Sequence, residues 1–177
     1  MKKLLLILFS IFGLLHITIA QCSLKTGVTT SGAKWFKASS EKIHSNVDLE
    51  NGLETAYAYL TVVQSPIDPD LLQFYLDIRT AATGSKRRVT PRNIKIIFKT
   101  GGSLDIRAEE IDYENLKGIG TENGFFRLKE DYFLQLKNNE IKSITIYDHR
   151  NSNRLICYPY RGLLQEQALC ISNRIYP

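Results

Sequence analysis

The chain has 177 residues, of which 44% are hydrophobic, with 23 lysines and arginines against 18 aspartates and glutamates. This composition is typical of an ordinary globular protein. The surplus of five positive charges is too small to indicate a nucleic-acid-binding protein. The sequence contains no internal repeat and no low-complexity block, which favours one folded domain.

The first twenty residues have the pattern of a cleavable secretory signal. Lys2 and Lys3 give it a charged start, residues 4–15 form an apolar run, and Ala20 is a small residue suited to cleavage. The apolar run is shorter than the roughly 20 residues that a transmembrane helix needs, so we predict no transmembrane span. Cleavage after Ala20 predicts a secreted or periplasmic protein, for which nucleic acid is a poor partner.

Three cysteines follow the predicted cleavage point: Cys22, Cys157 and Cys170. Cys22 raises the question of a lipid anchor, but Gln21 precedes it where a small residue is usual, so a lipoprotein is disfavoured. An odd number of cysteines in an oxidising compartment indicates one disulfide and one spare thiol. We favour Cys157–Cys170, because it would join a strand to the helix that follows. Pairing of Cys22 with either partner, or free buried thiols, are the alternatives.

Residues 21–50 are rich in Ser, Thr and Lys and are predicted to form a polar, poorly ordered arm before a single domain at residues 51–177. Trp35 and Phe36 would pack this arm against the domain, since aromatic pairs are usually buried. An exposed Trp35 between Lys34 and Lys37 would instead suit stacking on a sugar ring.

Two strands are predicted at residues 54–63 and 71–79, joined by a turn that contains two prolines. The first strand is largely apolar on both faces, which suits a central strand. Its Tyr57 and Tyr59 are a candidate ligand platform, although tyrosines also fit a half-buried strand without any ligand. In the second strand the core-facing residues are Leu72, Phe74, Leu76 and Ile78, and the outward-facing ones are Gln73, Tyr75, Asp77 and Arg79.

The strongest cluster of positive charge lies between residues 80 and 92. Lys86, Arg87, Arg88 and Arg92 have no acidic residue near them in sequence. Such a loop would bind an anionic glycan, a lipid headgroup or an acidic protein. Alternatively, it is a solvated loop whose charges keep strand edges apart.

Residues 93–109 form the clearest hairpin in the sequence. Apolar and polar residues alternate on both sides of Thr100–Gly102. A three-residue loop at 100–102 pairs Phe98 with Leu104, which places the apolar rows of both strands on one face. We expect this hairpin to extend the two preceding strands into a four-stranded meander.

The remaining chain predicts a mixed architecture. Residues 109–122 are expected to form an acidic, solvated connection. The predicted elements are strands at 125–128, 141–147 and 155–160, helices at 129–138 and 161–173, and a polar loop at 148–153. The fold class is therefore α+β: an antiparallel sheet or meander of about six or seven strands, with two short helices in the C-terminal third.

No constellation of residues indicates catalysis, a metal or a cofactor. Asp148 and His149 could act as a base and its orienting group, with Ser152 or Cys157 as nucleophile. However, adjacent loop residues seldom point the same way, and no strand–turn–helix nucleophile motif is present. His149 and Cys157 also lack the spacing of a metal site.

The sequence therefore predicts an exported binding module without catalytic activity. Its expected contact surfaces are the loop from Lys86 to Arg92, the face with Tyr57 and Tyr59, and the loop with His149 and Arg150. The alternatives are a secreted hydrolase that uses His149, or an inhibitor or immunity-type protein that masks an exported partner.

Overall fold

The structure is a computed structural model that describes residues 23–48, 52–84, 89–116, 119–148, 154–160 and 162–176. The predicted signal sequence at residues 1–20 lies outside this part of the chain. The described residues form eleven strands in two sheets, and two helices.

The larger sheet has seven strands and is antiparallel throughout its pairs. The strand order is β1-β2-β4-β5-β9-β8, and β3 also pairs with β4. The strands are β1 (Leu24–Val28), β2 (Lys34–Ala38), β3 (Glu41–Asp48), β4 (Gly52–Gln64), β5 (Leu72–Ala82), β8 (Glu110–Leu116) and β9 (Ile119–Leu128).

The smaller sheet has four antiparallel strands in the order β11-β10-β6-β7. They are β6 (Asn93–Phe98), β7 (Ser103–Arg107), β10 (Ile141–Tyr147) and β11 (Arg154–Cys157). Helix α2 (Glu130–Asn138) connects β9 to β10, and α3 (Leu163–Ile175) is the last element.

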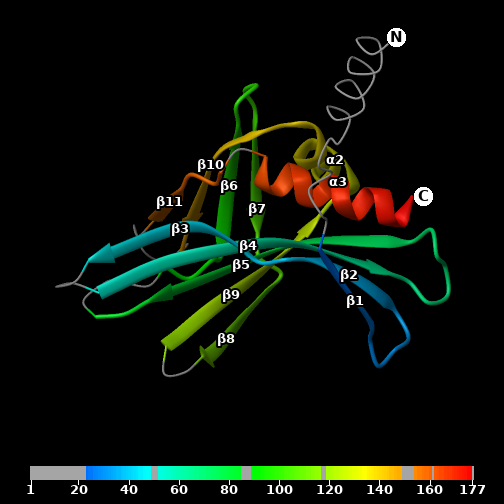
Figure 1. The fold of residues 1–177 in the computed structure, drawn as a ribbon, viewed down its shortest axis with the longest axis horizontal. Helices are drawn as coiled ribbons and strands as arrows, with labels where there is room; N and C mark the ends of the chain where they lie inside the picture. The colour runs from blue at the N-terminus through cyan, green and yellow to red at the C-terminus, as the bar shows by residue number, and fades with distance from the viewer. Residues whose placement is uncertain are drawn as a thin grey trace, which may run out of the picture.

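The two helices and the smaller sheet lie on the same side of the larger sheet (Figure 1). The core between the layers is built from the apolar residues that alternate along each strand, and includes Leu60, Leu76, Phe126, Ile144 and Ile171. The opposite face of the larger sheet is covered by none of the described elements, and we call it the open face.

The α+β class and the two late helices are confirmed, but the arrangement of the strands differs from the prediction. The four-stranded meander is wrong, because β4–β5 belongs to the larger sheet and β6–β7 to the smaller one. The chain changes layers between them, and the Thr80 hydroxyl donates a 2.8 Å hydrogen bond to the Val89 carbonyl at this crossing. Alternation in sequence identifies a strand's buried face, but not the layer to which it belongs.

The expectation of a poorly ordered N-terminal arm is also wrong, because residues 24–48 form β1, β2 and β3. These strands bury few large apolar side chains. Ala38 and Ile43 are nevertheless fully packed into the core, and Leu24 packs against it. Backbone pairing of β2 and β3 with β4 orders this segment more than hydrophobic burial does. Its polar composition therefore resembles that of a disordered segment.

The β6–β7 hairpin confirms that both apolar rows share one face, but its register is shifted by two residues. Ile96 pairs with Leu104 and Ile94 with Ile106. The Phe98 amide donates to the Gly102 carbonyl at 3.3 Å, so the turn is at residues 99–101. Gly101 and Gly102 both have positive φ, at 91° and 81°, which a glycine adopts without a Cβ clash.

The solvated connection expected at residues 109–122 is wrong as well: it forms β8 and the first half of β9. Its acidic residues occupy alternate positions of β8, so Asp112 and Glu114 share one side while Tyr113 points to the other. The predictions for the helix at 129–138, the strand at 141–147 and the last helix are confirmed, and Ile144 and Ile146 are buried as expected.

Helix α3 is attached to the larger sheet by a buried glutamine. The backbone amide of Leu60 in β4 donates a 2.9 Å hydrogen bond to Gln167 Oε1, and Gln167 Nε2 donates one of 3.1 Å to the Ser39 carbonyl. The pairing of β2 with β4 ends at Thr61 and that of β3 begins at Ala58. The Gln167 side chain therefore supplies the bond that the ladder lacks at Leu60.

Candidate functional site

The open face carries a grid of polar and aromatic side chains whose positions follow from the strand register. One row across the sheet runs through Lys25, Lys37, Thr61, Tyr75 and Arg127. The next row contains Tyr59, Asp77, Phe125 and Glu110, and a third contains Tyr57, Arg79, Asn123 and Asp112. The residues of a row are paired with one another across adjacent strands. Within one strand, side chains two residues apart lie on the same face.

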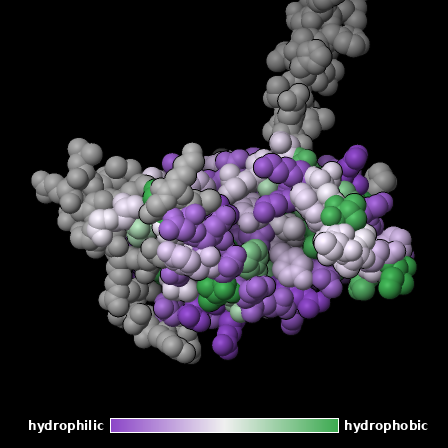
Figure 2. Space-filling model, turned by 90° about the horizontal axis from the view of Figure 1, so that it is seen from below, coloured by the Kyte–Doolittle hydropathy of each residue, from purple (hydrophilic) through white to green (hydrophobic). Residues whose placement is uncertain are grey.

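The larger sheet curves around this face. The edge hairpins β1–β2 and β8–β9 lie below the central strands β4 and β5 in Figure 1. Figure 2 looks onto the face from below and shows mainly hydrophilic side chains, interrupted by smaller hydrophobic areas. Polar groups at its centre are almost inaccessible: Asp77 is 4% exposed, Tyr59 is 5% and Asn123 is 5%.

Asp77 is the central carboxylate of the face. Its Oδ2 accepts a 2.7 Å hydrogen bond from the hydroxyl of Thr61 on the neighbouring strand. Burial raises its pKa from 3.8 to about 6, although that hydrogen bond and the charges of Lys37 and Arg79 act in the opposite direction. A carboxyl group with this pKa changes its charge near neutral pH.

Tyr59 lies beside Asp77 and is covered by a cation. The ammonium group of Lys37 lies 4.1 Å from the centroid of the Tyr59 ring, within the range of a cation–π interaction. Burial, followed by the charge of Asp77, raises the Tyr59 pKa to about 12. The phenol is therefore protonated at neutral pH and can act as a hydrogen-bond donor.

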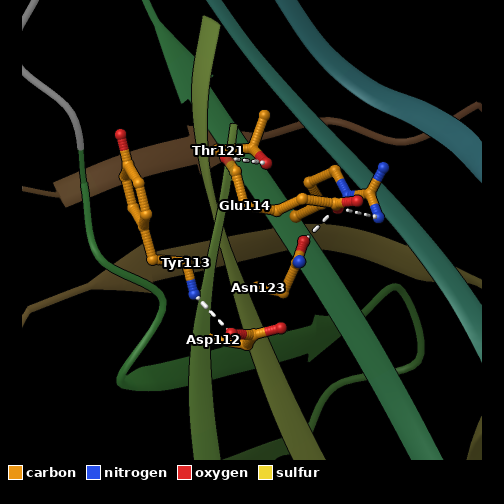
Figure 3. Close-up of polar contacts among 6 residues, drawn as sticks. Asp112, Tyr113, Glu114, Thr121 and Asn123 are labelled. Carbon is orange, nitrogen blue, oxygen red and sulfur yellow. Dashed lines mark hydrogen bonds and ion pairs between the residues drawn. The ribbon is translucent and has the colours of Figure 1, made fainter. Parts of the chain in front are cut away.

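Arg79 organises the side of the face toward β8 (Figure 3). Its Nε donates a 2.8 Å hydrogen bond to Asn123 Oδ1, and its guanidinium lies 3.2 Å from the Glu114 carboxylate. The Thr121 hydroxyl donates to the Glu114 carbonyl at 3.0 Å. Tyr113 points away from this network, and its backbone amide donates to the Asp112 carboxylate at 2.8 Å.

The structure places the sequence-predicted residues in three groups. Tyr57 and Tyr59 lie on the open face as expected. Arg92 lies elsewhere, with its Nε 3.2 Å from an Asp148 carboxylate oxygen, so it joins the bases of the two predicted contact loops. The side chains of Lys86, Arg87, Arg88, His149 and Arg150 lie outside the described residues.

The predicted Cys157–Cys170 disulfide is not formed, because Cys157 is a free thiol. Its side chain points from β11 into the core, whereas Cys170 is half-buried on α3 and is not free. Burial, with a contribution from the charge of Glu54, raises the pKa of the Cys157 thiol to about 12. Such a thiol is not a nucleophile near neutral pH. Cys22 lies outside the described residues.

A groove of about 580 Å³ opens at the end of β5, beside the open face. It is lined by side chains of both charges, including Arg107, Arg127, Glu109 and Glu130, and by Tyr176 near the C-terminus. Arg127 and Glu109 lie 3.6 Å apart. Among the described residues no group of three or more His, Cys, Asp or Glu side chains is arranged to hold a metal ion.

Most residues of this site were not predicted from the sequence to be site residues. Asp77 and Arg79 were correctly predicted to lie on the outward face of their strand, but the burial of Asp77 was not predicted. The alternation of Ile111 and Tyr113 with Asp112 and Glu114 was a signal for β8, which the acidic composition of the segment obscured. The curvature that buries Asp77 and Asn123 is a property of the whole sheet, and no single strand indicates it.

No protein-family model, curated protein sequence or solved structure matches this chain. Neither of the described helices has the length and hydropathy needed to cross a membrane.

Proposed function

We propose that the protein is an exported, non-catalytic binding module, and that its ligand contacts the open face of the seven-stranded sheet. Export is inferred from the charged and apolar pattern of residues 1–20. The choice of surface is inferred from the chemistry of the described residues.

The burial of polar groups on a face that no element covers is the observation that carries this proposal. A surface that needs only to be soluble would expose its charged side chains to water. Here Asp77, Tyr59 and Asn123 are buried on the open face, although desolvating a polar group is unfavourable. A few fixed polar groups that converge among aromatic rings are typical of ligand sites.

The chemistry of these groups favours binding over catalysis. A hydrolase would need a nucleophile or a second acid–base group close to Asp77. The groups around Asp77 instead hold it in place: Thr61 donates to its carboxylate, and Tyr59 retains its proton up to a pKa of about 12. Arg79 is engaged by Glu114 and Asn123.

The proposal is tested by screening the mature protein against a library of small saccharides, amino acids and short peptides, with ligand-observed NMR. Tyr57→Ala and Arg79→Ala are compared with Tyr113→Ala, which removes an exposed tyrosine that points away from the network. We expect the first two variants to lose about tenfold or more in affinity for the ligands found, a typical loss for a contact residue. Tyr113→Ala should bind normally.

Thermal unfolding of each variant separates a lost contact from a lost fold. A folded Tyr57→Ala and a folded Arg79→Ala that both bind every ligand as tightly as the natural chain would overturn the proposal. A library without any ligand for the natural chain would also count against it.

A further inference from the structure

The single tryptophan of the chain lies flat on the backbone at one edge of the open face. Trp35 in β2 is directly opposite Gly27 in β1. A Cβ atom on Gly27 would lie 2.4 Å from Cζ2 and 2.6 Å from Cε2 of the indole, so the ring occupies the space of a side chain there. Because Trp35 is only half-buried, part of the indole is accessible from outside.

Two lysines lie next to this ring in a pairing that is unfavourable by itself. Lys25 and Lys37 are directly opposite each other, two positions along from Gly27 and Trp35 and on the same face. Like charges at directly opposed positions of a sheet destabilise it. Lys37 contacts the Tyr59 ring, and in the described residues neither lysine forms an ion pair within 4 Å. An anionic group bound between them would relieve this repulsion.

The other side of the face selects against a ligand that is only a polyanion. Asp77 lies at the centre of the face and Glu114 toward β8, and Asp112 adds another carboxylate at the edge. A densely charged chain lying across the sheet would be repelled there. A ligand with hydroxyl groups would instead donate hydrogen bonds to the accessible carboxylates of Asp112 and Glu114.

We infer that the open face binds an acidic saccharide, and this inference rests on the function proposed above. A sugar ring stacks on Trp35, its carboxylate lies between Lys25 and Lys37, and hydroxyl groups of sugars further along the saccharide reach the accessible carboxylates of Asp112 and Glu114. The ring supplies an apolar face for the indole, and the single charge of a uronate matches the lysine pair.

Because Trp35 is the only tryptophan, its fluorescence reports directly on this site. The protein without residues 1–20 is titrated with hyaluronan fragments and other saccharides that carry one uronate per disaccharide. Maltotriose, which is uncharged, and polyglutamate, which is a densely charged chain, serve as comparisons. We expect a saturable change in emission with at least one uronate saccharide. Affinity for it should be at least tenfold higher than for maltotriose or polyglutamate, and should fall as salt is added.

The lysine pair is tested by Lys25→Ser and Lys37→Ser, with Lys142→Ser in the exposed part of β10 as the matched control. Each of the first two should weaken uronate binding by about fivefold or more and reduce its salt dependence, and Lys142→Ser should change neither. Calorimetry with Trp35→Ala, which should lose binding, and with Trp35→Phe, which should retain part of it, tests the stacking.

The outcomes distinguish this inference from the function on which it rests. If polyglutamate binds as tightly as the uronates, or if no saccharide binds while another ligand loses affinity in Arg79→Ala, the saccharide inference is overturned and the open face keeps its proposed role. If no ligand of any class depends on Tyr57 or Arg79, both fail.

Discussion

At the scale of single residues, Asp77 is the most informative side chain of the open face. Its pKa rises on folding from 3.8 to about 6, mainly because burial disfavours the charged carboxylate. Well below pH 4 the carboxyl is protonated in both states, and folding carries no penalty from its charge. As the pH rises from about 4 to about 6 the unfolded chain ionises more readily than the folded one, so stability is lost across this window. Above pH 6 the loss is constant.

We therefore predict that Asp77→Asn is more stable than the natural chain at pH 8 and gains little at pH 4. Two pKa units correspond to about 3 kcal/mol, which is an upper bound for the gain. Asparagine has a similar shape and can still accept the bond from Thr61. Urea unfolding at pH 4, 6 and 8 measures the effect, with Asp112→Asn as an exposed control on the same face. A stability gain that does not change with pH would contradict the assignment.

At the scale of elements, the contact between α3 and the larger sheet depends on one amide side chain. Gln167 bonds both to Leu60 in β4 and to Ser39, in the gap between β2 and β3. The long strand β4 can thus be shared by two short strands along one edge without leaving the Leu60 amide unsatisfied. The helix is part of the sheet's hydrogen-bonding scheme as well as its apolar cover.

Replacing Gln167 with alanine should lower the free energy of unfolding by about 1–3 kcal/mol, because a buried amide loses its acceptor. Gln165→Ala makes the same chemical change on the same helix at a position outside these two bonds, and should be nearly neutral. Denaturant unfolding of both variants gives the comparison. Equal stabilities for Gln167→Ala and Gln165→Ala would show that the amide bridge contributes nothing.

The elements differ in how far the sequence predicts them. Regular alternation identified β5, β6, β7 and β10 and the buried sides of these strands, because period two is a direct consequence of strand geometry. Strand β4 was predicted as a central strand because both of its faces are largely apolar. The N-terminal strands and β8 were missed because their order depends on ladder bonds to partners distant in sequence. Tyr57 and Tyr59 were found as candidates. Lys37 and Asn123 could not be identified as site residues from the sequence, because only the strand register places them beside Tyr59 and Arg79.

At the scale of the whole molecule, the two faces of the larger sheet have opposite roles. One is covered by four strands and two helices and forms the core (Figure 1), and the other holds a polar network. A sheet that is apolar on one side and polar on the other is ordinary. The burial of Asp77 and Tyr59 on the uncovered side is the feature on which the proposed binding function rests.

The most direct test of this account maps a bound ligand onto the backbone. Amide spectra of the labelled protein without residues 1–20 are recorded while the strongest ligand from the library is added. We predict that the shifted amides cluster in β2, β4, β5 and β9, around Lys37, Tyr59, Asp77 and Asn123. Shifts confined to the smaller sheet, or to α2 and α3, would contradict the claim that the open face is the binding surface.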